Sequence, residues 1–365
     1  MDWPTIRAAI DFGIEHGSDD LELSFIGGEP LLEWPNLRRA VQYAERRSLP
    51  KRLEYAFTTN GSLLTDRIAA FLNRYDIETR ISFDGVRQAQ DLRKKGSFDE
   101  MDRLLDRLRM KHPALFRRSV RIFITLVPDA VPFLADSVAY LLGKDVRDIV
   151  ISPCLTPASG WQKDWLEELE DQFARIFELS LRHFGRCNRV PVAWLRKMKG
   201  DRSAGPLPGA MCRAVKGTDL LIDADGQTYG CALFTSSYQQ YGSEFLASRM
   251  ARLRMGDFRA PDFWQRYADY PAALRKTELF HHKEKKHSSY GACGECRYLR
   301  QCAICPVAIG YHPDNQDPHR VPDFLCAMNI AALRYRRRFP ALPDPREILK
   351  RLLGAGKWRE LLVDR

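Results

Sequence analysis

The first 155 residues alternate between stretches with the period of a helix and short apolar runs that are typical of buried strands. Ile6, Ile10 and Ile14 share one face of an N-terminal helix, and the strand-like run 21–30 follows. Four further runs of this kind are separated by helical patterns and cover 52–61, 78–85, 120–128 and 147–154. Such alternation builds a parallel sheet covered by helices, so we predict an α/β fold.

Local signals indicate where the helices begin. Pro35 suits the first turn of a helix, Thr65 suits an N-cap, and Ser97 and Glu100 have the spacing of a capping box. Further helices are expected at 132–143, 163–186, 327–338 and 345–353.

Three of the predicted strands end in small or polar residues. These ends are Gly27-Gly28-Glu29-Pro30, Thr58-Thr59-Asn60-Gly61 and Ser82-Phe83-Asp84-Gly85. Ligands of parallel α/β folds bind at the carboxyl ends of the strands. We therefore expect the three turns to form one pocket; plain connecting turns are the alternative.

Seven of the nine cysteines lie in the last 155 residues, and five of these fall between Cys293 and Cys326. The chain has no apolar run of the ~20 residues that span a bilayer, and it does not begin with a signal peptide. A cytoplasmic location is therefore expected. Because thiols stay reduced there, the cysteines favour metal ligation over disulfides.

The number of cysteines leaves zinc and iron–sulfur ligation open. A closed zinc site takes four ligands, and a 4Fe–4S cluster takes up to four cysteines. Seven thiols are too many for one four-ligand site and one too few for two such sites. Two metal centres, one of which has an open or substituted ligand position, fit this number. A pair of zinc knuckles is the alternative, and Cys154 is interpreted as an inert buried thiol.

The other sequence features of the second half are less specific for a structure or a function. The run from Thr218 to Cys231 predicts a β-hairpin with its turn at 224–227. The polar stretch 281–289 is expected to be exposed, so its histidines are interpreted as solvated, and no acid/base pair is named. The net charge of +10 has no accompanying nucleic-acid-binding motif, so a solvated basic surface is expected and nucleic acid is not.

The motifs FIGGEP, AFTTNG and ISFDG, in this order on successive strands, resemble the core of a radical SAM enzyme. The series CX13GX4C, CX2CX5CX2C and a final cysteine resembles the SPASM extension, although its last CX2C is one residue shorter than the usual CX3C. The resemblance implies a partial (β/α)6 TIM-like barrel missing its first strand at 1–190. A cysteine-rich SPASM domain with a β-hairpin and helices would follow at 205–340, and a helical tail at 341–365.

The resemblance also implies the cofactors and their ligands. S-adenosylmethionine would bind at the strand ends through Gly27, Gly28, Glu29, Pro30, Thr59, Asn60, Ser82 and Asp84. Two auxiliary 4Fe–4S clusters would bind to the seven cysteines. One would be held by Cys293, Cys296, Cys302 and Cys326. The other would be held by Cys212, Cys231 and Cys305.

The sequence departs from the family pattern in three places. The CX3CX2C loop that holds the radical SAM cluster does not occur, and Cys154 is the first cysteine. We therefore expect a chain truncated at its start and inactive as given, with that third cluster present only if an upstream motif exists. Ala232 follows Cys231 where the sulfatase-maturing branch has Asp, and Gln90-Asp91 replaces a His-Asp pair. A peptide-modifying enzyme is therefore favoured over a sulfatase activator.

Three functions follow as hypotheses. The first is a radical SAM/SPASM maturase that modifies a peptide or protein side chain by hydrogen abstraction with a 5′-deoxyadenosyl radical. Its partners would be that substrate, with an acidic leader suited to the basic surface, and an electron donor such as a flavodoxin or ferredoxin. The alternatives are a non-catalytic iron–sulfur protein that binds peptides and a zinc-stabilised interaction module.

Overall fold

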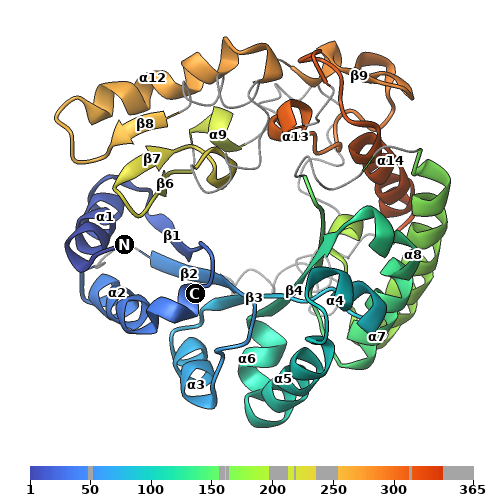
Figure 1. The fold of residues 1–365 in the computed structure, drawn as a ribbon, viewed down its shortest axis with the longest axis horizontal. Helices are drawn as coiled ribbons and strands as arrows, with labels where there is room; N and C mark the ends of the chain where they lie inside the picture. Colours follow the sequence, from blue (N-terminus) through green and yellow to red (C-terminus); the bar gives the residue numbers. More distant parts are fainter. Residues whose placement is uncertain are drawn as a thin grey trace, which may run out of the picture.

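The computed structural model describes residues 1–47, 52–155, 161, 164–196, 213–217, 219–235, 254–280, 282–311 and 315–339. Its first half contains a parallel five-stranded sheet in the order β1-β2-β3-β4-β5. The strands are β1 (Asp20–Phe25), β2 (Arg52–Thr59), β3 (Glu78–Ser82), β4 (Val120–Leu126) and β5 (Ile149–Pro153). All five predicted strands are therefore confirmed, and they form a curved half-barrel (Figure 1).

Helices connect the strands, as expected for parallel neighbours. They are α1 (Trp3–His16), α2 (Trp34–Arg47), α3 (Asp66–Arg74), α4 (Arg87–Arg93), α5 (Phe98–Lys111), α6 (Pro113–Arg118), α7 (Leu134–Gly143) and α8 (Leu166–Cys187). Two 3₁₀ turns, η1 (Pro30–Glu33) and η2 (Pro128–Phe133), precede α2 and α7. After α8, a single parallel bridge pairs Val192 with Ile149 beside β5.

The N-cap predictions have different outcomes. The Thr65 hydroxyl accepts a hydrogen bond from the Ile68 amide at 3.3 Å, so this cap is confirmed. Ser97 does precede α5, but its side chain makes no capping bond. Instead its hydroxyl donates to the Lys94 carbonyl at 2.7 Å and accepts from the side-chain amide of Gln90 at 2.9 Å. The predicted capping box is wrong because a tertiary partner takes the hydroxyl.

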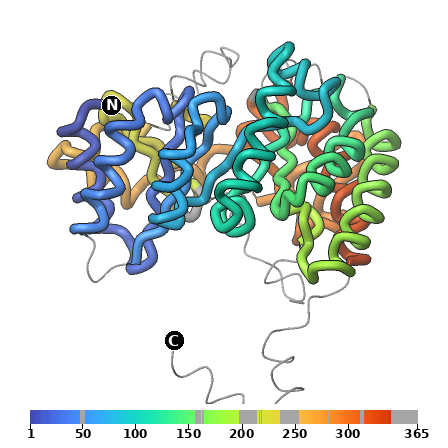
Figure 2. Tube along the Cα trace, turned by 90° about the horizontal axis from the view of Figure 1, so that it is seen from below, coloured from blue at the N-terminus to red at the C-terminus, as the bar shows by residue number. Residues whose placement is uncertain are grey.

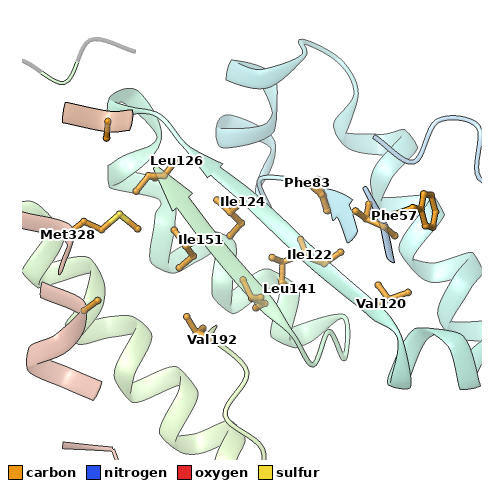
Figure 3. Close-up of a cluster of buried hydrophobic side chains, with 14 of the residues drawn as sticks. Phe57, Phe83, Val120, Ile122, Ile124, Leu126, Leu141, Ile151, Val192 and Met328 are labelled. Carbon is orange, nitrogen blue, oxygen red and sulfur yellow. The ribbon is translucent and has the colours of Figure 1, made fainter. Parts of the chain in front are cut away.

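The half-barrel buries one face of its sheet under the helices. Along β4 the residues alternate between buried and half-buried, and Ile122, Ile124 and Leu126 lie on the buried face. Ile151 of β5 and Leu141 of α7 pack in the same apolar cluster (Figure 3). This alternation is the period of a strand with one covered face, so the other face of the sheet is free to be polar.

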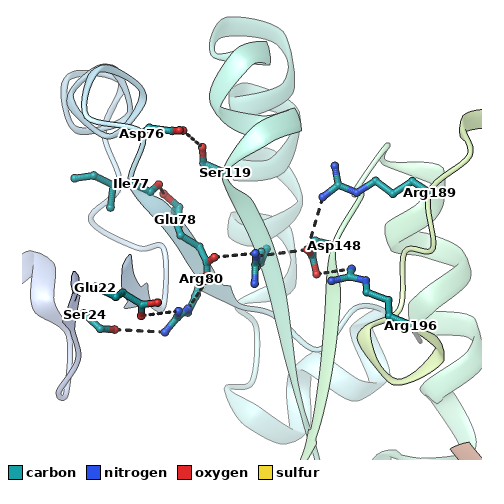
Figure 4. Close-up of polar contacts among 12 residues, drawn as sticks. Glu22, Ser24, Asp76, Ile77, Glu78, Arg80, Ser119, Asp148, Arg189 and Arg196 are labelled. Carbon is teal, nitrogen blue, oxygen red and sulfur yellow. Dashed lines mark hydrogen bonds and ion pairs between the residues drawn. The ribbon is translucent and has the colours of Figure 1, made fainter. Parts of the chain in front are cut away.

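A chain of ion pairs crosses that polar face near the amino ends of the strands (Figure 4). Arg80 bridges Glu22 of β1 and Glu78 of β3, at 3.3 and 2.6 Å. Arg121 of β4 continues to Glu78 at 2.9 Å and to Asp148 at 3.4 Å. The Asp148 side chain is only 3% exposed and also pairs with Arg196 at 2.7 Å and Arg189 at 3.7 Å. Charged groups therefore occupy the end of the sheet opposite the predicted pocket.

The second half is built from short elements. A three-stranded antiparallel sheet contains β6 (Leu221–Ile222), β7 (Gln227–Tyr229) and β8 (Arg254–Asp257), and the β6–β7 pair confirms the predicted hairpin. A second pair joins β9 (His287–Ser288) to β10 (Gly291–Ala292). The helices here are α9 (Arg213–Lys216), α12 (Phe263–Arg275), α13 (Pro306–Tyr311) and α14 (Asp323–Arg338). The predicted helix at 345–353 and tail at 341–365 lie outside the described residues.

The two halves contact each other at both ends of the half-barrel (Figures 1 and 2). At one end, Phe12 of α1 stacks on Trp264 of α12, with ring centroids 4.9 Å apart, and also contacts Phe258. At the other end, Phe177 of α8 packs on Tyr335 of α14 at 5.4 Å. The cysteine-rich half is therefore held against both the first helix and the last helix of the half-barrel.

The predicted exposure of 281–289 is wrong at Lys286 and Ser288, which are both buried, Lys286 with only 1% of its surface exposed. His282 and His287 are exposed as predicted, and His281 is outside the described residues. Within the described ranges, no helix combines the length and apolar composition that crossing a membrane requires.

We predict that Asp148→Asn lowers the free energy of unfolding by about 1–3 kcal/mol, because the buried partner of three arginines loses its charge. Chemical denaturation measures the change. The matched control is Asp136→Asn, which removes an exposed pair with Arg175 and should change the free energy by less than about 1 kcal/mol. Equal effects of the two substitutions would contradict the role given to Asp148.

Candidate functional site

The turn after β1 is tied to the end of β2 by the carboxylate of Glu29. One carboxylate oxygen accepts hydrogen bonds from the Leu31 amide at 3.1 Å and from the Thr59 hydroxyl at 2.8 Å. The other accepts from the Asn60 amide at 2.7 Å. Two of the three predicted turns are therefore joined directly. The parallel register that pairs Phe25 with Phe57 brings these strand ends to the same edge.

The two glycines of this turn leave open space beside the backbone. A Cβ atom added at Gly27 or Gly28 would meet no other atom within 4 Å. Gly27 has a φ of +151°, which L-residues with a side chain rarely adopt. A ligand can therefore approach the peptide groups of both residues closely.

The third turn is fixed by Asp84, whose side chain is buried. The Arg93 guanidinium donates to both carboxylate oxygens, at 2.7 and 2.8 Å, and the Thr125 amide of β4 donates at 2.8 Å. The Gln90 side chain accepts from the Asp84 amide at 2.9 Å. Asp84 thus connects β3 to β4 and α4. Arg93 was missed by the sequence analysis, because nothing in a single sequence pairs it with a carboxylate nine residues away.

Gly85 closes this turn against α7. Its φ is +95°, and an added Cβ would lie 2.3 Å from the Ser137 Cβ. Any side chain at this position would therefore displace α7. Of the eight residues predicted for this edge, the structure links Glu29, Thr59 and Asn60 to one another, and the assignment of all eight to a ligand stays a prediction.

Four cysteines line one cavity of about 260 Å³ in the second half. They are the four that the family pattern predicts for a single cluster: Cys293, Cys296, Cys302 and Cys326. Apolar and aromatic side chains complete the wall, among them Tyr298, Leu299 and Ile304. The sequence prediction that these residues belong together is consistent with this cavity, although they span 34 positions of the chain.

Hydrogen bonds hold the wall of this cavity in place. Asn329 of α14 is buried, accepts from the Ala303 amide at 2.9 Å and donates to the Leu325 carbonyl at 2.8 Å. The Ser288 hydroxyl donates to the sulfur of Cys326 at 3.2 Å. The cysteine loop and α14 are therefore fixed relative to each other by side chains outside the predicted cysteine set.

Burial shifts the pKa of three of the cavity thiols. Burial raises the pKa of Cys293 to about 11 and that of Cys302 to about 12. Burial also raises the pKa of Cys326, against the opposing effect of the bond from Ser288. Since thiolates are the metal ligands, loading such a site releases protons.

The size and chemistry of the cavity fit an iron–sulfur cluster. A cavity volume of about 260 Å³ is many times the roughly 10–15 Å³ that a single water molecule requires, so the space is far larger than one ion occupies. Among the residues that the structure describes, no three His, Cys, Asp or Glu side chains converge on the position of a single metal ion. Four soft thiols around a space of this size suit a multi-iron cluster.

The second predicted cysteine set is only partly visible. Cys212 lies outside the described residues. Cys231 precedes the 3₁₀ turn η5 (Ala232–Phe234), and Cys305 precedes α13. Both elements pack against η7 (Glu278–Phe280), with Phe234 and Phe280 rings 6.2 Å apart. This neighbourhood is consistent with a shared site for Cys231 and Cys305, which stays a prediction.

Comparisons with known proteins agree with this architecture. No family model matches the chain. The chain is 28% identical over 151 residues to an uncharacterized protein of Methanocaldococcus jannaschii, covering 41% of this chain and 51% of that protein. It is 29% identical over 92 residues to the radical SAM cyclopropyl synthase TigE of Paramaledivibacter caminithermalis, covering 25% of this chain and 19% of the synthase. It is 19% identical over 232 residues to a cysteine-type anaerobic sulfatase-maturating enzyme of Clostridium perfringens, covering 60% of this chain and 61% of the enzyme.

Several solved structures match the fold, among them the following two. One is native anSMEcpe with bound AdoMet and the Kp18Cys peptide, with a TM-score of 0.70, 14% identity, and coverage of 93% of this chain and 89% of that chain. The other is Streptococcus suis SuiB bound to its precursor peptide SuiA, with a TM-score of 0.55, 15% identity, and coverage of 89% and 69%. The chain has the fold of these enzymes. It spans about half the length of the first curated relative and less than two thirds of each of the three.

We predict that Cys302→Ala lowers the iron content of the anaerobically reconstituted chain by about 4 atoms, because a cluster held by four cysteines loses a ligand. Iron and sulfide analysis measures the change. Cys187→Ala is the matched control, since Cys187 is exposed at the end of α8. Unchanged iron in Cys302→Ala, or zinc in place of iron in the parent chain, would contradict the assignment.

Proposed function

We propose that the chain belongs to a radical SAM maturase of the SPASM type, which modifies a peptide or protein side chain through a 5′-deoxyadenosyl radical. The observation that carries the proposal is the single cavity lined by Cys293, Cys296, Cys302 and Cys326. The half-barrel and the linked turns at its carboxyl edge support the same function. The similarity to SuiB and anSMEcpe, whose structures contain peptides, supports a peptide substrate.

S-adenosylmethionine is proposed to bind at the carboxyl edge of the sheet. The peptide groups of Gly27 and Gly28 face open space, and their carbonyls suit the ammonium group of this ligand. Glu29 contributes its negative charge while its oxygens hold Thr59 and Asn60 in place. Pro30, Ser82 and Asp84 complete the proposed edge. Asp84 does so mainly by positioning, because its oxygens already bind Arg93 and the Thr125 amide.

Two auxiliary 4Fe–4S clusters are proposed for the second half, one in the cavity and one held by Cys212, Cys231 and Cys305. When bound, such clusters accept and donate single electrons, and an open iron can bind substrate. These 365 residues contain no CX3CX2C motif for a third cluster. We therefore expect this stretch to bind S-adenosylmethionine without cleaving it.

An acidic electron-carrier protein, such as a flavodoxin or ferredoxin, is the second proposed partner. Tyr298 forms part of the cavity wall, and two guanidinium groups contact its ring, those of Arg297 at 4.8 Å and Arg337 at 5.0 Å from the ring centroid. Both arginines are exposed. This places positive charge at the surface beside the proposed cluster, where it attracts an acidic partner.

We predict that Glu29→Ala weakens S-adenosylmethionine binding at least about tenfold, because the turn loses three hydrogen bonds to a charged group. Isothermal titration calorimetry measures the affinity. The control is Glu33→Ala, since Glu33 lies in the same turn but its side chain is exposed. Identical affinities of the two variants would contradict a ligand site at this edge.

We also predict that the complete gene product, if its coding sequence contains an in-frame upstream CX3CX2C, forms 5′-deoxyadenosine after anaerobic reconstitution with titanium(III) citrate. Liquid chromatography with mass spectrometry detects the product. If the iron-loaded protein forms no 5′-deoxyadenosine, the proposed maturase function is wrong. A protein that binds peptide but does not cleave S-adenosylmethionine would instead support a non-catalytic accessory function.

A further inference from the structure

Lys286 is a fully buried lysine, and among the residues that the structure describes its ammonium group binds no carboxylate. Its Nζ donates to three backbone carbonyls, those of Glu278 at 2.8 Å, Leu279 at 3.0 Å and Pro318 at 2.8 Å. Its own carbonyl accepts from the Cys293 amide at 2.9 Å. Backbone carbonyl dipoles therefore solvate the ammonium group, and the backbone of the same lysine binds Cys293, the first cysteine of the proposed cluster.

A buried ammonium needs a compensating negative charge. Lysine is almost never fully buried unless it is paired, because removing its charge from water is costly. The carboxylates within electrostatic range, Asp317 and Glu278, are solvent-accessible, and Asp317 already pairs with His287 at 2.9 Å. Cys293 is the buried group in the same range, and it lines the cavity. We therefore expect the negative charge that compensates the Lys286 ammonium to lie in the cavity that Cys293 lines.

Lys283 also donates to backbone carbonyls, in its case those of the cysteine loop. It belongs to η8 (Lys283–Lys285), and its Nζ donates to the carbonyls of Cys302 at 2.5 Å and Leu299 at 3.3 Å. Cys302 and Leu299 both line the cavity. The Lys283 ammonium therefore binds the backbone of two cavity residues. The Lys286 ammonium binds carbonyls outside the lining, and Lys286 is connected to the cavity through its own carbonyl, which accepts from the Cys293 amide. Lys285 between them is exposed.

We propose that Lys283 and Lys286 are positioning residues that neutralise an anionic cluster in this cavity and raise its reduction potential. The inference rests on the proposed iron–sulfur function. A 4Fe–4S core held by four thiolates is negatively charged, and one-electron reduction adds one negative charge without making or breaking a bond. Nearby positive charge stabilises the reduced form more than the oxidised form. Removing either charge therefore makes reduction harder.

The test is an anaerobic redox titration of the reconstituted chain, followed by electron paramagnetic resonance, with titanium(III) citrate as the one-electron donor. The signal of this cluster is the one that Cys302→Ala removes. We expect Lys286→Met and Lys283→Met each to lower the ratio of reduced to oxidised cluster about tenfold at a fixed potential. That change equals about 59 mV for a one-electron couple. Lys285→Met, a substitution in the same turn, should leave the potential unchanged because water screens its charge.

A second measurement separates charge from packing. Lys286→Met removes a buried ammonium and also leaves three backbone carbonyls without their donor, so the Tm of each cluster-free variant serves as its own reference. The rise in Tm on cluster loading should be smaller in Lys286→Met than in the parent or in Lys285→Met. If Lys283→Met and Lys286→Met have the same reduction potential as Lys285→Met, and cluster loading raises the Tm of Lys286→Met as much as that of Lys285→Met, this inference is wrong while the proposed function stands. A parent chain that binds no iron overturns the proposed function, and this inference with it.

Discussion

The contact between α8 and α14 connects the two parts of the proposed site. On one side, α14 packs on α8 through rings, with Phe177 against Tyr335 and Phe339, and through the pair of Arg334 with Glu170 at 2.7 Å. On the other side, α14 supplies Cys326 and Asn329 to the cavity of the cysteine loop. A single helix therefore fixes the cavity relative to the last helix of the half-barrel. The Trp161 ring, stacked on Phe324 at 4.7 Å, extends this contact to the segment that follows β5.

The half-barrel separates two kinds of polar chemistry because its strands are parallel. The amino ends contain compensated ion pairs that include the buried Asp148, and these suit stability rather than ligand binding. At the carboxyl ends, Glu29 binds amides and a hydroxyl, and glycines leave the backbone open. The same parallel topology therefore gives one closed end and one end where a ligand can approach.

Much of the fold could be predicted from the sequence because its signals are local. Apolar runs of strand length predicted all five strands, and Thr65 predicted the start of α3. The errors have a tertiary origin. Ser97 binds Gln90 instead of capping its helix, and Lys286 is buried within a stretch whose polar composition indicated exposure. For the site, the family resemblance grouped the four cysteines that line the cavity. Arg93, Asn329 and the two lysines act through long-range contacts that no single-sequence pattern contains.

The proposed function depends on an iron–sulfur cluster in the cavity between Cys293, Cys296, Cys302 and Cys326. Anomalous X-ray diffraction from crystals of the anaerobically reconstituted chain can locate the metal, with data collected on both sides of the iron and zinc absorption edges. We expect iron peaks inside this cavity, within bonding distance of the four sulfur atoms. A peak that appears only above the zinc edge, or a cavity without metal in a chain that binds iron elsewhere, would rule the cluster out.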